Sequence, residues 1–272
     1  MQPAPERLRR RHPTSPAAAR RSAGRASQRV RGTDAARRWA RDARVAMACG
    51  LALLAGCVAA APRTPLVRHW GEMRAVLREG RTQGRVALAD VLGPNSVAVG
   101  ALEGLAAEVT VVDGVAHLAE VVDATSPEGL RTRRAAPGDR ATLIVAAEVD
   151  AWEEHALDDV PDLDALERRI AELAAPTGPL PFRVEGVARR VELHVLDHSC
   201  PIAHPDGPAP WRYTGRDEPV TLVGFFAEGA GGVLTHHGQS THTHALVPRA
   251  NVSGHLDEVA FAAGARLYLP RR

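Results

Sequence analysis

The chain has 272 residues, of which 34 are basic and 32 acidic, giving a formal net charge of +2 at pH 7. The charge is divided unevenly: residues 1–56 hold 13 Arg and 3 acidic side chains, a net of +10, whereas residues 57–272 hold 21 basic and 29 acidic side chains, a net of −8. Because the basic excess is confined to the leading segment, the composition argues against a nucleic-acid-binding surface elsewhere, and we expect no nucleic-acid partner.

An apolar run near the N-terminus has the pattern of an export signal. The Arg-rich residues 37–44 precede an apolar stretch at residues 45–56, which is too short to span a bilayer. The stretch leads into Leu-Ala-Gly-Cys57, which resembles the bacterial lipobox, where the cysteine is lipidated and becomes the first residue of the mature protein. The alternatives are an uncleaved anchor and a cysteine that follows small residues by chance.

These patterns divide the chain into three parts. We expect an Arg-rich leader with a lipoprotein signal peptide at residues 1–56, a tether at residues 57–66 and a folded domain at residues 67–272. A lipid on Cys57 would anchor the exported protein to a membrane, on its periplasmic or cell-surface side. Cys200 is then the only cysteine within the mature domain, so no internal disulfide is expected.

Hydrophobic periodicity and turn residues predict the elements in the first part of the domain. Residues 70–77 have helical spacing, and Gly80 ends the helix. Short strands are predicted at residues 97–101, 108–112, 117–122 and 143–149. The turn residues Asp113-Gly114 join the two middle strands into a predicted β-hairpin.

An amphipathic helix is predicted after Pro161 and ends by Pro176. Asp162 is its expected N-cap, and its apolar face consists of Leu163, Leu166, Ile170 and Leu173. The remaining sequence predicts strands at residues 182–187, 191–196, 220–226, 241–247, 255–262 and 265–269, the first two on either side of Gly186. The expected fold class is therefore α+β, a mixed or antiparallel β-rich domain with a few helices and two lobes at about residues 67–187 and 188–272.

Five of the twelve histidines of the chain lie between His236 and His255. In an extended strand, side chains two residues apart point to the same side, so His242 and His244 would direct two imidazoles at one point. His255 follows eleven residues later, which is far enough for the strand to end, turn and pair back. Three neutral imidazoles with an open fourth position are a common catalytic zinc site, and a polar strand face is the alternative.

Two further polar groups lie near these histidines in the sequence. His236 and His237 precede the pair and are either a source of a proton donor or part of a solvated loop. The run Asp-His-Ser-Cys200, with His204 beyond it, has residue types suited to a second metal cluster or a nucleophile. Four prolines between residues 201 and 210 favour a polar loop there instead.

Four segments carry a resemblance to a known family. Residues 100–114 read GALEGLAAEVTVVDG, and the helix at residues 163–173 is followed by PFRVEG at residues 181–186. Residues 222–226 read LVGFF and precede His242-Thr-His244 and Gly254-His255. The third histidine, His255, follows the second, His244, by eleven residues. In this order and spacing, the segments resemble those of the α-acetolactate decarboxylase family, over about residues 70–272.

The resemblance implies an acetolactate-decarboxylase-like fold and a zinc-dependent decarboxylase. Its substrate would be acetolactate or a related 2-hydroxy-3-keto acid, and its product would be acetoin-like. In that family, the positions of His242, His244 and His255 bind zinc, although imidazole ligands also suit other divalent transition metals. The metal would stabilise the enediolate charge, Arg183 would bind the substrate carboxylate and Glu108 would move a proton.

The chain also departs from the family pattern. Ala101 stands where the family has Thr, and Ala106-Ala107 replaces its Asp-Gly. The second catalytic glutamate of the family lies well past the third histidine, and we expect no counterpart in the seventeen residues that follow His255 here. An exported, non-catalytic lipoprotein that binds a metal or a small acid is therefore the alternative function, and a homodimer is left open.

Overall fold

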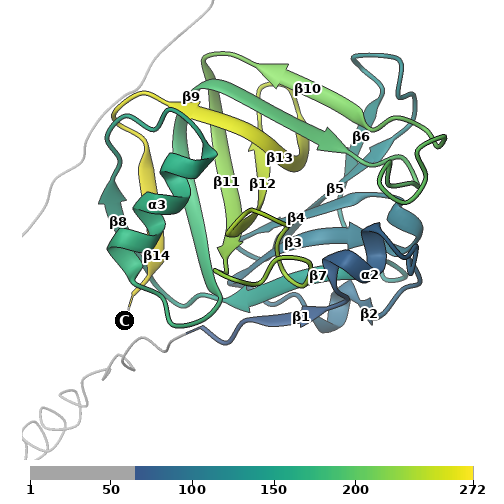
Figure 1. Cartoon of the computed structure of the whole chain (residues 1–272), viewed down its shortest axis with the longest axis horizontal. Helices are drawn as coiled ribbons and strands as arrows, with labels where there is room; N and C mark the ends of the chain where they lie inside the picture. The colour runs from purple at the N-terminus through teal and green to yellow at the C-terminus, as the bar shows by residue number, and fades with distance from the viewer. Residues whose placement is uncertain (1–64, 272) are drawn as a thin grey trace, which may run out of the picture. The chain divides into compact units, whose positions relative to one another are not determined.

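The computed structural model describes residues 65–271 (Figure 1). Within that range the chain forms two seven-stranded sheets whose strands pair in antiparallel fashion, with few helices, as the α+β prediction expects. None of the helices in this range is long and apolar enough to cross a bilayer. The predicted leader, the lipidation site Cys57 and nearly all of the tether lie outside the described residues.

The first sheet is built from the N-terminal half of the domain. Its strands are β1 (Arg68–Trp70), β2 (Val86–Ala87), β3 (Ser96–Leu102), β4 (Glu108–Val112), β5 (Val115–Val121), β6 (Leu130–Arg133) and β7 (Arg140–Glu148). They follow the order β1-β7-β3-β4-β5-β6, with β2 beside β7. The predicted hairpin is β4–β5, and its turn residues Asp113 and Gly114 both have positive φ, as a two-residue hairpin turn of this type requires. Short helices lie between strands: α2 (Met73–Leu77), η1 (Leu88–Asp90) and η2 (Glu103–Leu105).

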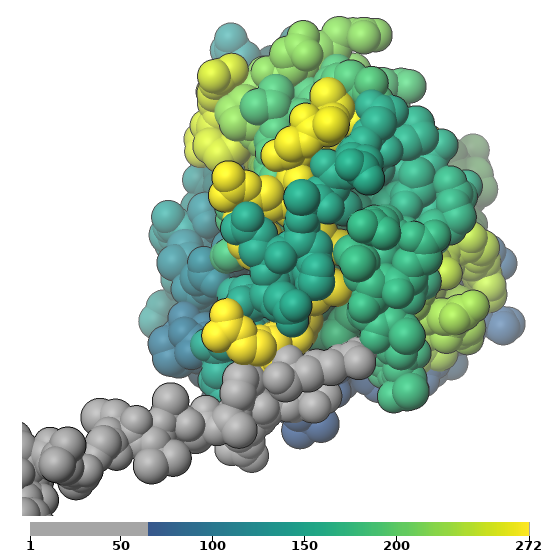
Figure 2. Space-filling model, turned by 90° about the vertical axis from the view of Figure 1, so that its left-hand side faces the viewer, coloured from purple at the N-terminus to yellow at the C-terminus, as the bar shows by residue number. Residues whose placement is uncertain are grey.

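The second sheet is built from the C-terminal half. Its strands are β8 (Trp152–Ala156), β9 (Leu180–Val195), β10 (Trp211–Gly215), β11 (Glu218–Phe226), β12 (Thr241–Val247), β13 (Val252–Phe261) and β14 (Arg266–Pro270). The long strand β9 pairs with β11 along its first half and with β13 along its second half, so the path β11-β12-β13-β9 closes on itself. Figure 2 shows the C-terminal segment, in yellow, crossing one face of the molecule, where β14 pairs with both β8 and β9.

The predicted amphipathic helix is α3 (Leu163–Ala174). Asp162 is its N-cap, and its side chain accepts a hydrogen bond of 2.7 Å from the backbone N–H of Ala165. Its buried residues are Leu163, Leu166, Ile170 and Ala174, which belong to the main hydrophobic cluster with residues of the second sheet. The helix therefore covers that sheet, as Figure 1 shows.

The two sheets share a hydrophobic cluster in which Val97 and Val99 of β3 lie with Val223 and Phe225 of β11. The chain passes from the first sheet to the second between β7 and β8, at residues 149–151. The predicted lobe boundary near residue 187 instead falls inside β9. Gly186 does not interrupt that strand: a Cβ there would lie 2.7 Å from the Cβ of Ala265, so this glycine allows close packing rather than a turn.

Candidate metal centre

Strands β12 and β13 bring the three predicted histidines together. His242 and His244 lie two residues apart in β12, and His255 of β13 is the direct cross-strand partner of His244. The next strand continues the row, because His194 of β9 is the cross-strand partner of His255. Cross-strand partners point to the same face of a sheet, so three neighbouring strands place imidazoles side by side.

The geometry of this cluster suits a transition metal. One nitrogen from each of His242, His244 and His255 lies within 4.8 Å of the others, and all three side chains are buried. Nδ1 of His242 and Nε2 of His244 are buried without a hydrogen-bond partner. Buried polar atoms are normally satisfied, so these two nitrogens are available as ligands, and their residue types fit zinc.

Thr110 of β4 orients one of these rings. Its Oγ1 lies 3.0 Å from Nδ1 of His244, which directs Nε2 of that ring into the cluster. An outer hydrogen bond of this kind fixes the tautomer and the orientation of a metal-binding histidine. The first sheet therefore provides the support for a ligand that the second sheet carries.

Burial keeps the three imidazoles uncharged. Desolvation lowers the pKa of His242 to about 3 and, together with the neighbouring histidines, holds the pKa of His244 and of His255 well below the ordinary value. A metal binds the neutral imidazole, so the cluster is in the ligating form at neutral pH.

Glu108 lies opposite the histidines, at the start of β4. Strand alternation places it on the same face as Thr110, and its Oε2 lies 3.6 Å from Nε2 of His244. Burial raises the pKa of Glu108 to about 7, and the charge of His194 and a hydrogen bond from the backbone of Leu196 partly oppose that effect. Because the pKa of His244 is lowered, its imidazole is uncharged near neutral pH, so the contact with Glu108 is not an ion pair in either protonation state of the carboxyl group.

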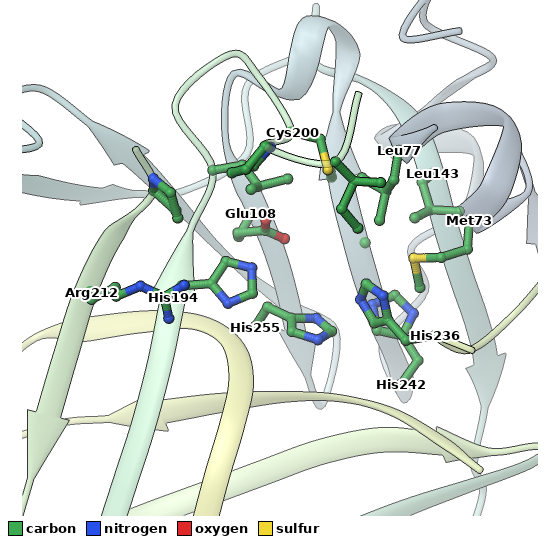
Figure 3. A pocket seen from close by; sticks show the side chains of 16 residues that line it. Met73, Leu77, Glu108, Leu143, His194, Cys200, Arg212, His236, His242 and His255 are labelled. Carbon is green, nitrogen blue, oxygen red and sulfur yellow. The ribbon is translucent and has the colours of Figure 1, made fainter. Parts of the chain in front are cut away.

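The histidines, Glu108 and the space between the sheets form a pocket of about 240 Å³ (Figure 3). His242, His255 and Glu108 line it, whereas His244 is fully buried and does not line it. Two polar residues that the sequence patterns did not single out, His194 and Arg212, also line it. The pocket thus combines candidate metal ligands with a carboxyl group and a guanidinium group.

A hydrogen-bonded chain connects these two additional residues. Nδ1 of His194 lies 2.7 Å from Oδ1 of Asp257, and Nη1 of Arg212 lies 2.9 Å from Oδ2 of the same carboxylate. Asp257 accepts from both groups, so Nε2 of His194 is left to face the pocket. The sequence contained one indication that His194 has a polar environment, since Glu192 and His194 alternate with apolar residues in a predicted strand. Its position beside His255, however, results from the pairing of β9 with β13, which local sequence does not specify.

Arg183 occupies a different place from the one expected. It lies on the same face of the second sheet as His244, but Val223 of β11 is paired with both and separates them. Two strand spacings place their backbones about 10 Å apart. Nη1 of Arg183 donates to Asp113 at 3.0 Å, and the guanidinium lies over the rings of Trp152 and Tyr268. Arg183 is not among the pocket-lining residues, whereas Arg212 is.

The two histidines that precede the pair differ from each other. His236 lines the pocket, and its ring lies edge-on to His255 with 4.8 Å between ring centroids, so the solvated-loop interpretation is wrong for this residue. His237 is exposed and agrees with that interpretation. Their loop is attached to α2, because the backbone N–H groups of Met73 and Arg74 donate to carbonyls of Val233 and Gly232.

The predicted polar loop after β9 contributes to the pocket as well. Cys200 is buried and lines it, with its thiol free of any disulfide. Pro201 and Ile202 follow and also line the pocket. This segment therefore forms part of the apolar boundary of the site, and the described structure places no metal-ligand cluster there.

Comparisons of the sequence with known proteins give no match, either to family models or to curated proteins. The fold, in contrast, has clear counterparts among solved structures. Acetolactate decarboxylase from Bacillus subtilis subspecies spizizenii superposes with a TM-score of 0.61 at 15% identity, covering 76% of this chain and 86% of that one. α-Acetolactate decarboxylase from Bacillus subtilis strain 168 gives a TM-score of 0.60 at 16% identity, covering 76% and 85% of the two chains.

A third structure comes from Staphylococcus aureus and is described as a protein of unknown function similar to α-acetolactate decarboxylase. It matches with a TM-score of 0.59 at 13% identity, over 75% of this chain and 84% of that one. The chain therefore has the acetolactate decarboxylase fold, as the resemblance in sequence implies. At these identities, the likeness establishes the fold alone.

Proposed function

We propose that this chain is a metal-dependent decarboxylase of acetolactate or a related 2-hydroxy-3-keto acid, with an acetoin-like product. One observation carries the proposal: within an acetolactate decarboxylase fold, His242, His244 and His255 form a buried cluster that faces the carboxyl group of Glu108. A protein that only stores metal has no evident need for a carboxyl group with a raised pKa in the same pocket.

His242, His244 and His255 would hold the metal, and zinc is the ion that this ligand set suits best. When bound, the ion supplies Lewis-acid stabilisation of negative charge on the oxygens of the substrate. Imidazole ligands also accept other divalent transition metals, so the identity of the ion is part of the test.

The other polar residues of the pocket have separate roles in this proposal. Glu108 carries the proton, because its pKa of about 7 allows both protonation states near neutral pH. Arg212 offers its guanidinium to the carboxylate of the substrate, the role that the resemblance assigned to Arg183. His194 is held by Asp257 and presents Nε2 as a hydrogen-bonding group toward the substrate oxygens.

Metal analysis and an activity assay on the same preparation test this function. We expect protein comprising residues 58–272 to contain one divalent metal per chain and to release carbon dioxide and acetoin from acetolactate. Glu108→Gln should keep its metal and lose turnover by about 10²- to 10⁴-fold, as loss of a proton carrier typically does. Fully loaded wild-type protein that releases no carbon dioxide from acetolactate or its ethyl homologue would exclude the decarboxylase.

A second function, the binding of a metal or small acid without turnover, has two observations in its favour. The family position Arg183 is engaged by Asp113 outside the pocket, and Ala101 lines the pocket without a hydroxyl. Under this alternative, the protein would bind 2-hydroxy acids only when metal is present and would release them unchanged. Product analysis by chromatography after prolonged incubation separates this function from the first.

We also propose that the protein is exported and anchored by a lipid on Cys57, on the periplasmic or cell-surface side of a membrane. The support is the Leu-Ala-Gly-Cys57 sequence after the apolar run. Mass spectrometry of the native N-terminus should find an acylated Cys57 as the first residue. A mature chain that begins elsewhere, or an unmodified Cys57, would contradict this proposal.

A further inference from the structure

The pocket has two chemically different sides. Figure 3 shows Glu108, His194 and Arg212 toward one side, and Met73, Leu77 and Leu143 grouped on the other, above His236 and His242. The polar side offers charged and hydrogen-bonding groups. The opposite side presents hydrocarbon and sulfur, which pair poorly with the oxygens of a small hydroxy acid.

The apolar side consists of residues from separate segments, and we call it the apolar wall: Met73, Leu77, Leu143, Cys200 and Ile202. All except Ile202 belong to one buried hydrophobic cluster, which also includes Ala101. The absence of a hydroxyl at Ala101 extends this apolar character to the floor of the pocket. The wall is thus a continuous surface rather than scattered contacts.

The apolar wall also leads out of the pocket. A second cavity of about 150 Å³ shares Met73, Leu77, Ile202 and His236 with the first, and its other lining residues are Arg74, Arg78, Gly232 and His237. Ile202 is 56% exposed, although the other wall residues are buried. Met73, Leu77 and Ile202 therefore continue the apolar wall from the first pocket into the second cavity, where Arg74, Arg78 and two histidines are the polar lining residues. The two cavities together leave room for a ligand longer than the first pocket alone would take.

We infer that the substrate carries an unbranched alkyl substituent of at least three carbons, which lies along the apolar wall while its oxygens face the histidines. This inference rests on the proposed function and narrows its substrate class. Acetolactate itself would place only methyl groups against the wall and would leave most of it facing water. A longer chain removes both surfaces from water, which is the main source of affinity for apolar groups.

Affinity should therefore increase with chain length. Each buried methylene strengthens binding about fourfold, provided the wall remains in contact with the added carbon. The probes are straight-chain 2-hydroxy acids from lactate to 2-hydroxyoctanoate, titrated calorimetrically into the zinc-loaded protein. We expect Kd to fall about fourfold per carbon at least as far as the propyl side chain. A Kd that stays constant or rises from methyl to propyl would overturn the inference.

A variant at the exposed end of the wall tests the route of the chain without disturbing the core. Ile202→Ser should weaken binding of 2-hydroxyoctanoate about tenfold and leave lactate binding unchanged, because only the longer chain reaches this residue. Val187→Ser is the matched control, since Val187 is 57% exposed and lines neither cavity. Equal losses in the two variants, or no loss in Ile202→Ser, would contradict the proposed path.

Turnover measurements separate failure of this inference from failure of the proposed function. On 2-alkyl-2-hydroxy-3-oxobutanoates, kcat/KM should rise from the methyl to the propyl compound, through a lower KM. Turnover of acetolactate with declining kcat/KM for longer homologues would keep the decarboxylase and overturn the inference. No turnover of any homologue would exclude the decarboxylase. The dependence of Kd on chain length would then be the only test of whether an alkyl chain binds along the apolar wall.

Discussion

The inner face of the second sheet carries two groups of polar side chains that differ in how they are satisfied. Arg183 has Asp113 and Glu185 as charge partners and two aromatic rings beside its guanidinium; its Nε makes no hydrogen bond but lies 3.3 Å from Oε1 of Glu185. The histidine cluster, on the other side of Val223, contains buried nitrogens with no hydrogen-bond partner. A guanidinium held between two carboxylates stabilises a fold, whereas buried imidazole nitrogens that converge on one point are suited to hold a metal. The contrast favours the histidine cluster as the candidate metal site, because its buried nitrogens converge on one point and those of Arg183 do not.

The largest change in stability is expected when one of the three candidate metal-binding histidines is replaced. His244→Ala should abolish the stabilisation that zinc confers, which amounts to about 4 kcal/mol at a free zinc concentration near 1,000 times Kd. The increase in Tm on adding zinc measures it independently of any cavity that the substitution creates. His237→Ala is the control, because His237 is exposed and should leave the zinc-induced shift intact. Full zinc stoichiometry in His244→Ala would refute the ligand assignment.

The next effect concerns the charge of Glu108 in the metal-free protein. Its folded-state pKa of about 7 lies above the ordinary value of 4.5, so the folded chain retains a proton that the unfolded chain has released. This difference destabilises the fold as pH rises from 4.5 to 7, by on the order of 3 kcal/mol once the pH is above 7. Below pH 4.5 the cost is absent, since both states are protonated.

Denaturant unfolding of Glu108→Gln, which stays uncharged, checks this prediction. The variant should be more stable than the wild type at pH 8, and the difference should shrink toward zero as the pH falls to 4.5. The histidines contribute the opposite slope in both proteins, because their lowered pKa values favour the fold at higher pH, so only the difference between the two proteins is informative. A pH-independent difference would contradict the raised pKa.

A smaller effect is expected from the support behind the cluster. Thr110→Val removes the hydroxyl that lies 3.0 Å from Nδ1 of His244 and should weaken zinc affinity about 10- to 100-fold. Thr243→Val is a closely matched control, because Thr243 is also buried beside the ligands but its Oγ1 has no hydrogen-bond partner. Competition with a chromophoric chelator measures both affinities. Equal affinities in the two variants would mean that Thr110 does not orient the ligand.

The smallest change in the free energy of unfolding is expected when Arg183 is replaced. Arg183→Lys keeps the charge but loses the planar stacking on Trp152 and Tyr268, which should cost about 1 kcal/mol of unfolding free energy. Binding of 2-hydroxy acids should be unchanged. Arg212→Lys should show the reverse pattern, with little loss of stability and a several-fold rise in Kd. Weakened acid binding in Arg183→Lys would return the carboxylate-binding role to that residue.

Local sequence patterns predicted much of this molecule. The N-cap Asp162, the hairpin turn at Asp113-Gly114 and the strand containing His242 and His244 are each specified within a few residues, and each agrees with the structure. The pairing of His244 with His255 also followed, because eleven residues allow little more than a turn between two adjacent strands. These predictions succeeded where the contacts are short in sequence.

The parts that sequence reasoning did not predict depend on long-range pairing. His194 enters the site only because β9 pairs with β13, and its partner Asp257 lies 63 residues further along the chain. Arg183 matches its motif, but the turn residue Asp113 binds it from the first sheet, 70 residues away. Two short strands were predicted around Gly186, whereas the single strand β9 runs through it, and the glycine allows close contact with Ala265.

The pairing of β9 also determines the order in which the protein can fold as it is synthesised. All strands of the first sheet precede residue 149, so that sheet can form early. Strand β9 must wait for partners that emerge later, because β10, β11, β13 and β14 all follow it. Thr110, whose hydroxyl group contacts the imidazole of His244, lies 134 residues before that histidine in the chain. Long-range pairing of this kind is slow, so capture of zinc should coincide with the last kinetic phase of refolding.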